Sequence, residues 1–482
     1  MKKFFAFTIF IAIIFVAIFF RINHITDSGI TTDEGQTYFI SSAENLNSVF
    51  DRTTSYDRNP PGYYLILHPF VRLLGQKEEL MRTFPIIFSI LSIVFLYLIL
   101  SLTINRRTAL VGSFLVATSS LCIGYSIESR MFMLLTLFTL SSYFFLLKAL
   151  KHPEFGTKFW IYFSVSCLAG LYTHYLFLVY LIGFFATFLI LVFNVEEKMK
   201  KVLMLALSLI AMIIGYAFWI PSIRHHLDVE YYRFTSNDSF NIFNTLKDFA
   251  NGDLLLFMLI TVLLIVALVI RRNYEKDEIK KEKQLYTFSF CSFLLIGILI
   301  PILYSIWIEP VFGTDSLIAL TPILMAITAI GLWKLSKLHW SLILPIIAII
   351  FLLNTPWNNS LYPKAMGQDF RGVIEYVKEN EFPIIVHSPK NHHALRFYNQ
   401  TNIPIKPLPY TNDFREYTLN LDSENKFKDL VKDIENFYLV IEDSKEDPKG
   451  LIVSWSHNTC KNYQILNIRG LSVYFFSNCS LN

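Results

Sequence analysis

The stretch that decides the fold is FFAFTIFIAIIFVAIFFRI at residues 4–22, and it is soon followed by GITTDEGQTYF at residues 29–39. An uninterrupted apolar run of this length can cross the hydrocarbon core of a bilayer as a helix. The second stretch carries two adjacent carboxylates, Asp33 and Glu34. The sequence therefore predicts a membrane span that ends just before an acidic segment at the bilayer surface.

The composition of the whole chain also indicates a membrane protein. Of its 482 residues, 54% are hydrophobic and 17% are charged, whereas about a quarter of the residues in soluble chains are charged. The net charge of +4 is too small to indicate a nucleic-acid partner, and none is expected. The five cysteines show no spacing typical of zinc or thiol-redox sites. We therefore predict a multi-pass protein of the cell membrane.

Apolar runs that alternate with basic loops predict about eleven transmembrane helices. Because Lys and Arg concentrate in cytoplasmic loops, we expect Arg107, Lys200 and Lys280 inside, the N-terminus inside and the C-terminus outside. The run at 60–75 is too short to cross, so we expect an interfacial or re-entrant helix in an external loop at 23–82. The expected spans are 4–20, 84–104, 108–125, 130–148, 159–174, 176–194, 202–220, 254–270, 285–307, 316–333 and 339–354.

After residue 354 the apolar runs stop, and amphipathic helical patterns alternate with short β-branched strands. We therefore expect a transmembrane domain at 1–354 and a small extracytoplasmic α/β domain at 355–482. Cys460 and Cys479 both fall in the second domain. They could form a disulfide in an oxidising compartment, although sequence separation alone fixes no geometry.

Two acidic turns fall on the predicted outer face. Asp33 and Glu34 follow the first span, and Glu128 lies in the turn between the third and fourth spans. TTDE at 31–34 can be a capping box, which explains Glu34 and leaves Asp33 without a role. Neighbouring residues of a helix do not share a face, so we expect different roles for these two candidate catalytic carboxylates: one is the base, and the other holds the helix or the substrate.

Carboxylates at an outer membrane surface suit the transfer of a sugar to a hydroxyl group. A hydroxyl is a weak nucleophile at neutral pH, so a positioned carboxylate must accept its proton. The leaving group would be a lipid phosphate of the same bilayer, whose oxygens a guanidinium can hold with two bonds at once. Arg130 could instead be an arginine that snorkels to the lipid headgroups. The side chains expected at the substrate are those of Arg58, Arg82, Arg130, Tyr63 and Tyr64.

Several short motifs occur in a fixed order: TTDEGQTYF, RNPPGYYLILHPFVRLLG, LMRTFPIIFSILSIVFLYLI, YSIESRMFMLLTLF and GLYTHYLFLVYL. In this order they resemble the bacterial branch of the GT-C glycosyltransferases, relatives of the protein O-mannosyltransferases and of the lipid A aminoarabinose transferase. The resemblance implies a GT-C membrane fold and a polyprenyl-phosphate sugar donor, with Asp33 as catalytic base and Glu128 as the second carboxylate. Nearby arginines would engage the lipid phosphate. The acceptor would be a hydroxyl of a protein, a lipid or a cell-surface glycan, and the anomeric configuration would invert.

Two positions depart from the pattern of this family. Asn59 stands where relatives have a histidine before two prolines, and Asp315 and Ser316 stand where they have an arginine and a tyrosine. A metal ligand and a basic phosphate contact are therefore missing there. His174 is either a histidine hydrogen-bonded at the end of a span, or a ligand of the lipid phosphate or of a metal. A divalent metal ion is thus an open expectation.

Two other classes of function remain as alternatives. A transporter or lipid flippase would place ionisable residues in the middle of its spans, whereas the expected span centres are nearly free of charge. A non-catalytic membrane scaffold would not need Asp33. The order of the motifs favours the enzyme, with mannose, glucose, galacturonic acid and aminoarabinose all open as the sugar.

Overall fold

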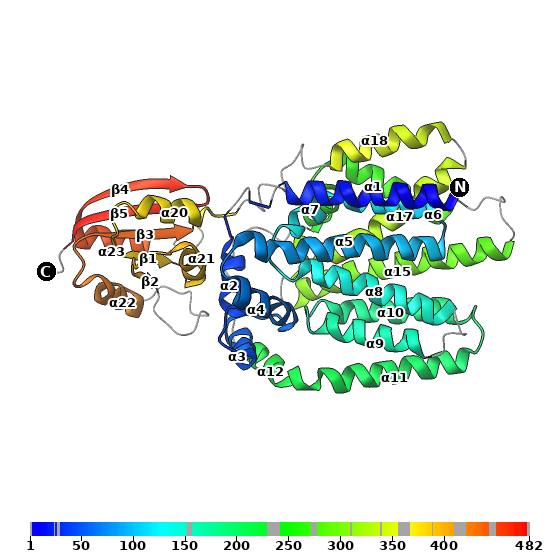
Figure 1. The fold of residues 1–482 in the computed structure, drawn as a ribbon, viewed down its shortest axis with the longest axis horizontal. Coiled ribbons are helices and arrows are strands. Elements are labelled where there is room, and N and C mark those ends of the chain that lie inside the picture. The colour runs from blue at the N-terminus through cyan, green and yellow to red at the C-terminus, as the bar shows by residue number, and fades with distance from the viewer. Residues whose placement is uncertain are drawn as a thin grey trace. The chain divides into compact units, whose positions relative to one another are not determined.

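The computed structural model of the protein describes two compact units (Figure 1). We call the first the helical unit, which comprises Met1–His24, Arg82–Ile220 and Phe240–Pro363. The second, the mixed unit, comprises Ile25–Met81, Pro221–Ser239 and Lys364–Asn482. The described residues are 2–23, 25–26, 29–151, 157–228, 242–270, 277–308, 311–337, 340–354, 367–387, 389–408, 421–442 and 450–479.

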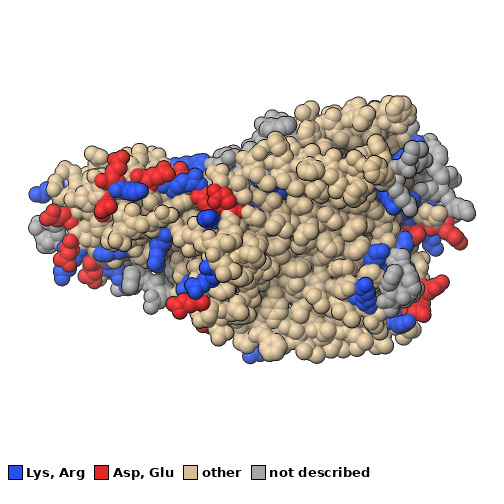
Figure 2. All heavy atoms as spheres, viewed as in Figure 1, with Lys and Arg blue, Asp and Glu red and all other residues tan. Residues whose placement is uncertain are grey.

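Long apolar helices build the helical unit. A helix satisfies its backbone polar groups internally and can therefore lie in hydrocarbon. On the face shown in Figure 2, charged side chains are scarce along the flank of these helices and gather at their ends. The main helices are α1 (Lys2–Ile22), α5 (Glu78–Thr103), α6 (Arg106–Ala117), α7 (Ser120–Ser126), α8 (Phe132–Lys151), α9 (Lys158–Leu171), α10 (Phe177–Val192), α11 (Lys198–Tyr216), α14 (Leu254–Val269), α15 (Asp277–Trp307), α17 (Thr321–Ser336) and α18 (Ile343–Asn354).

Six helices among the described residues are long and apolar enough to cross a membrane, and up to eight if each of two bent pairs counts as one span. Three further apolar helices are shorter, at Lys158–Leu171, Phe177–Val192 and Trp340–Asn354. The polytopic class is therefore confirmed. The predicted count of about eleven spans depends on these shorter helices and stays a prediction.

One predicted span, 108–125, is broken in the structure. α6 and α7 meet at Thr118 and Ser119, and their axes differ by 58°. The hydroxyl of Ser119 accepts a hydrogen bond from the N–H of Cys122 at 3.4 Å and thereby caps a new helix. The sequence did not predict this break, because the apolar run continues through Ser119.

α17 is the central helix of its unit, because it packs against α6, α14 and α15 and nearly all of its residues are buried. Gly331 allows the close approach to α14, since an added Cβ would lie 2.2 Å from the carbonyl oxygen of Leu263. Aromatic rings join α8, α10 and α15: the ring of Phe293 lies 5.0 Å from that of Phe184 and 5.4 Å from that of Tyr143. These contacts join the middle of α8 and of α10 to α15.

The mixed unit combines short helices with a five-stranded sheet of order β2-β1-β3-β5-β4. β1 runs parallel to β2 and β3, while β5 runs antiparallel to β3 and β4. Its helices are α2 (Thr32–Ser41), α3 (Leu46–Tyr56), α4 (Gly62–Leu74), α12 (Ile220–Asp228), α20 (Phe370–Val377), α21 (Pro389–Tyr398), α22 (Leu421–Val431) and α23 (Leu451–Thr459). Its strands are β1 (Ile384–His387), β2 (Ile405–Pro407), β3 (Phe437–Glu442), β4 (Cys460–Ile468) and β5 (Leu471–Cys479).

β1, β3, β4 and β5 form where the β-branched and aromatic runs predicted them, whereas the short strand β2 was not predicted. Buried rings of Phe427, Phe437 and Phe476 fill the core on one face of the sheet. Cys460 and Cys479 are partners in the β4–β5 ladder and form a disulfide. The small α/β region and the pairing of these two cysteines are therefore present in the structure.

Helix α2 packs directly on α21 of the C-terminal region. The two backbones approach closely at Gly35, where an added Cβ would lie 2.6 Å from the backbone nitrogen of Ala394. Beside this contact, Thr32 Oγ1 donates a hydrogen bond to Asn391 Oδ1 at 2.6 Å. The segment at Ile25–Met81 therefore forms one compact unit with the C-terminal region.

A second contact fixes the chain just before α2. The hydroxyl of Tyr398 accepts a hydrogen bond from the Ile30 N–H at 2.6 Å and donates one to Glu78 Oε1 at 2.5 Å. Arg371 forms an ion pair with the same carboxylate at 2.5 Å. Burial and the adjacent Glu78 carboxylate raise the pKa of Tyr398, so its hydroxyl keeps the proton that it donates.

Candidate active site

The first turn of α2 separates the two adjacent carboxylates. Thr31 Oγ1 accepts a hydrogen bond from the Glu34 N–H at 3.2 Å, and Glu34 Oε2 accepts one from the Thr31 N–H at 3.0 Å. This capping box confirms the structural interpretation of Glu34. Glu34 is 0% exposed, whereas Asp33 is exposed. Asp33 is therefore the carboxylate of this motif that a substrate can reach.

The loop before α4 is built around Asp57. Its Oδ1 accepts hydrogen bonds from the backbone N–H and the Nδ2 of Asn59, both at 2.9 Å, and its Oδ2 accepts one from the Tyr64 hydroxyl. Asn59 therefore closes an Asx-type turn. Tyr63 and Tyr64 are fully buried, and the bond from Tyr64 supports the loop from inside, while Arg58 is half-buried. The short helix expected at 60–75 is confirmed as α4.

The second acidic turn belongs to the helical unit and connects α7 to α8. The N–H of Arg130 donates a hydrogen bond to the carbonyl oxygen of Glu128 at 2.8 Å, which closes the turn. Glu128 is half-buried and Arg130 is buried. A largely buried guanidinium is less hydrated than one in water, so it interacts more strongly with an anion.

Arg82 and His174 lie in the same unit. Arg82, near the start of α5, is only 1% exposed. His174 Nδ1 accepts a hydrogen bond from the Leu176 N–H at 3.1 Å, and its ring lies 6.0 Å from that of Phe132, the first residue of α8. The turn with His174 and the turn with Glu128 and Arg130 therefore lie at the same end of α8 and α10.

Asp315 and Ser316, which depart from the family pattern, also lie near the start of α10. The Asp315 carboxylate accepts a hydrogen bond from the Ser316 N–H at 2.9 Å in the short helix α16 (Thr314–Leu317). The carbonyl oxygen of Ser316 accepts one from the Tyr180 hydroxyl of α10 at 3.4 Å. A carboxylate thus stands where the family resemblance led us to look for a basic phosphate contact.

A metal site is not formed by the part of the chain that the structure describes, because no three His, Cys, Asp or Glu side chains are grouped to hold an ion there. Asn59, at the position of the family's histidine, is engaged with Asp57. A divalent metal ion therefore stays a prediction.

Several buried basic residues were not identified from the sequence, among them Arg21 and His226. Arg21, at the end of α1, is 0% exposed; its Nε donates a hydrogen bond to Ser89 Oγ and its Nη1 one to the carbonyl oxygen of Ala117, both at 3.0 Å. A lone arginine that closes an apolar run was the available signal, and its role is to join α1, α5 and α6. His226 of α12 lies with Nε2 3.1 Å from the carbonyl oxygen of Thr54, and no local pattern marks it.

Comparison with known protein families gives one match. Residues 58–220 match the model of the family described as dolichyl-phosphate-mannose-protein mannosyltransferase. No curated protein matches the chain by sequence. The matched region contains Arg58, Arg82, Glu128 and His174 and begins after Asp33.

Solved structures share the fold over nearly the whole chain. ArnT from Cupriavidus metallidurans bound to undecaprenyl phosphate aligns with a TM-score of 0.64 at 13% identity, over 98% of this chain and 98% of that chain. The archaeal oligosaccharyltransferase AglB from Archaeoglobus fulgidus, in complex with an inhibitory peptide and a dolichol-phosphate, aligns with a TM-score of 0.59 at 12% identity, over 99% and 74%. The arabinofuranosyltransferase AftD from Mycobacteria gives a TM-score of 0.55 at 11% identity, over 100% and 42%.

The architecture is that of the GT-C membrane glycosyltransferases, which confirms the resemblance carried by the motifs. Within this chain, residues 58–220 are similar to the dolichyl-phosphate-mannose-protein mannosyltransferase family. At these low identities the solved structures establish the fold, and the chemistry has to be argued from the residues of this chain.

Proposed function

We propose that the protein is an integral membrane glycosyltransferase that transfers a sugar from a polyprenyl-phosphate donor to an acceptor hydroxyl on the extracytoplasmic face. The observation that carries the proposal is the division of the acidic motif: Glu34 is buried in the helix cap, and Asp33 is exposed beside it. An exposed carboxylate on a fixed helical turn is suited to accept a proton from a substrate.

In the proposed reaction, the Asp33 carboxylate takes the proton of the acceptor hydroxyl while the hydroxyl oxygen attacks the anomeric carbon. The bond between that carbon and the phosphate oxygen breaks on the opposite side, and the polyprenyl phosphate leaves with the electron pair. The anomeric configuration therefore inverts. Arg82 and Arg130 stabilise the charge on the departing phosphate, and Glu128 orients the acceptor or supports a cation.

The donor class is supported by the cations of this chain and by what its structural relatives hold. ArnT was solved with undecaprenyl phosphate and AglB with a dolichol-phosphate. Arg58 and His174 are half-buried in this chain and retain surface for a phosphate. Tyr63 and Tyr64, which are buried, would act on the donor by holding the Arg58 loop in place. The acceptor is a protein, a lipid or a cell-surface glycan.

The membrane orientation is part of the proposal. The three shorter apolar helices also cross the bilayer, so that the chain has about eleven spans. Basic loops then lie in the cytoplasm, and both acidic turns and the C-terminal region lie outside. The rule that Lys and Arg favour cytoplasmic loops supports this orientation.

The decisive experiment replaces the proposed base. Asp33→Asn keeps the size of the side chain and removes the proton acceptor, so transfer should fall about a hundredfold or more, since general-base assistance typically supplies about 10² to 10⁴. Binding of the donor lipid should not change. Transfer is measured in nanodiscs with a panel of defined polyprenyl-phosphate sugars. Asp51→Asn is the matched control, because Asp51 is an exposed carboxylate of α3.

The outcomes separate the proposal from its alternatives. Near wild-type transfer by Asp33→Asn would reduce Asp33 to a residue of the helix start, and Glu128 would be the next candidate base. Arg130→Ala should weaken donor binding as well as rate, because its guanidinium is assigned to the phosphate. A flippase would move labelled lipid across the bilayer without any transfer, and a scaffold would do neither.

A further inference from the structure

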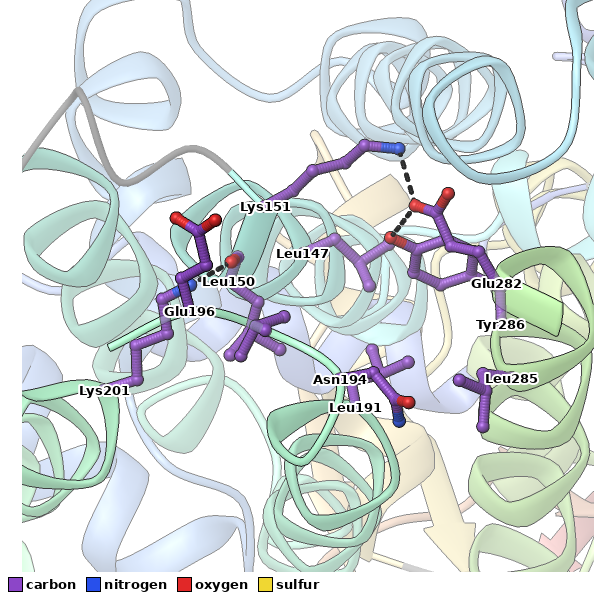
Figure 3. A pocket seen from close by; sticks show the side chains of 11 residues that line it. Leu147, Leu150, Lys151, Leu191, Asn194, Glu196, Lys201, Glu282, Leu285 and Tyr286 are labelled. Carbon is purple, nitrogen blue, oxygen red and sulfur yellow. Dashed lines mark hydrogen bonds and ion pairs between the residues drawn. The ribbon is translucent and has the colours of Figure 1, made fainter. Parts of the chain in front are cut away.

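A cavity of about 330 Å³ opens where α8 and α10 end and where α11 and α15 begin (Figure 3). α8 starts beside the turn of Glu128 and Arg130 and ends at this cavity with Lys151. A helix rises 1.5 Å per residue, so the two places are about 30 Å apart along α8. The cavity is therefore separate from the candidate active site.

The cavity lies at a boundary between apolar and polar chain. Its apolar walls come from Leu147 and Leu150 of α8, Leu191 of α10 and Leu285 of α15. α15 is strongly charged before Leu285 and apolar after it. Such a transition marks the level of the lipid headgroups, where an acyl chain meets polar groups.

Charged groups line the two sides of the cavity in equal number. On one side, Lys151 Nζ lies 3.0 Å from Glu282 Oε1, to which the Tyr286 hydroxyl also donates at 3.1 Å. On the other side, Figure 3 shows Lys201 and Glu196, and Lys201 Nζ donates to the carbonyl oxygen of Leu150. Lys201 is 4% exposed, so its ammonium is fixed at the wall.

We propose that this cavity binds a phospholipid whose headgroup carries one phosphate and one primary ammonium, the phosphatidylethanolamine class. Lys201 attracts the phosphate, and the Glu282 carboxylate across the cavity accepts hydrogen bonds from the ammonium. The glycerol and upper acyl chain lie on the leucines.

The balance of charges selects this class over other phospholipids. Two lysines and two glutamates line the cavity, so the lining carries no net formal charge and does not favour an anionic headgroup over a zwitterionic one. A quaternary ammonium has no N–H to donate and is recognised by aromatic cages. Of the described residues at the cavity, Tyr286 alone is aromatic.

Native mass spectrometry of the full chain in detergent tests the proposal, with phosphatidylethanolamine, phosphatidylcholine and phosphatidylglycerol added at equal concentration. The wild type should retain phosphatidylethanolamine about tenfold better than the other two, as expected for a hydrogen bond between charged groups. Glu282→Gln should remove the preference over phosphatidylcholine, whereas Lys201→Gln should weaken binding of all three. Glu278→Gln and Lys200→Gln are matched controls, because both residues are exposed neighbours outside the cavity lining.

Equal retention of the three lipids by the wild type would overturn the proposal. So would an unchanged preference in Glu282→Gln, since the carboxylate would then not contact the ammonium. The Glu282→Gln result is independent of Lys201, whose removal could disturb the end of α8. Neither readout depends on glycosyl transfer.

Discussion

Asp33 and Glu34 are neighbours in sequence and lie in opposite environments. One residue turns a helix by about 100°, so a side chain that faces the interior is followed or preceded by one that faces away. Glu34 closes the cap of α2 from a fully buried position, and Asp33 is left exposed. The same physical rule therefore divides structural and proposed catalytic roles between two identical functional groups.

The first prediction concerns the cap. Glu34→Gln preserves a side-chain oxygen that can accept from the Thr31 N–H, so it should leave stability nearly unchanged. Glu34→Ala removes that acceptor and should lower the free energy of unfolding by about 1 kcal/mol. Unfolding of both variants in detergent checks this. If Glu34→Gln lost transfer as severely as Asp33→Asn while folding normally, Glu34 would have a chemical role as well.

The second prediction concerns pH and rests on His393. Its ring stacks on Phe39 with a centroid distance of 4.0 Å, and Arg52 lies on that phenylalanine at 4.4 Å. Burial and the neighbouring charges of His392, Arg396 and Arg52 lower the pKa of His393 to about 3.

Below pH 6.5 the unfolded chain therefore binds a proton that the folded chain does not bind. His393 alone should lower the free energy of unfolding by about 1.4 kcal/mol per pH unit, or about 2 kcal/mol at pH 5, and His392, whose pKa burial lowers to about 4, adds a second contribution. His393→Phe keeps a ring on Phe39 and should reduce this slope. Denaturant unfolding at pH 7.5, 6 and 5 measures it, with the exposed His457→Phe as control. Equal slopes in wild type and His393→Phe would contradict the prediction.

At the scale of elements, the contact between α2 and α21 leaves no room for a side chain at position 35 of the mixed unit. Backbone atoms of Ala394 occupy the space that a side chain at Gly35 would need. Backbone cannot move aside as the end of a flexible side chain can. The position of α2, and with it that of Asp33, is therefore set by a helix of the C-terminal region.

The third prediction follows from this contact. Gly35→Ala should lower the free energy of unfolding by about 1 to 3 kcal/mol, the usual cost of overpacking, and should also reduce transfer because α2 is displaced. Gly124→Ala is the control, since nothing lies within 4 Å of a Cβ there and alanine favours a helix. Thermal unfolding of the two variants compares them. An unchanged midpoint for Gly35→Ala would show that the two helices can separate at little cost.

Helices and strands with a strong local sequence pattern could be predicted. The elements against which they pack could not. Apolar runs gave the long helices, and β-branched runs gave β1, β3, β4 and β5. The break at Ser119 was hidden because a single capping hydroxyl interrupts an otherwise apolar run. Tyr63 and Tyr64 were expected at the substrate and are buried in the structure. The sequence could not predict this, because the bond from the Tyr64 hydroxyl to Asp57 forms only in the folded loop.

At the scale of the whole molecule, the proposed chemistry depends on the placement of the loops across a bilayer. The fourth prediction is that reporters fused at Arg107, Lys200 and Lys280 read cytoplasmic, and that one fused after Asn482 reads external. The reason is the preference of Lys and Arg for cytoplasmic loops. Alkaline phosphatase and green fluorescent protein fusions measure this. Opposite readings at Arg107 and Lys200 would remove the basis for placing both acidic turns outside.

The bond between Ile30 and Tyr398 joins residues 368 positions apart. At a synthesis rate of about 5 to 20 residues per second, roughly 20 to 70 s separate the appearance of the two partners. During that time α2 has been synthesised, whereas α21, against which it packs, has not. Final assembly of α2 is therefore a late event in biogenesis, and a chain released before α21 would carry Asp33 without the surface that orients it.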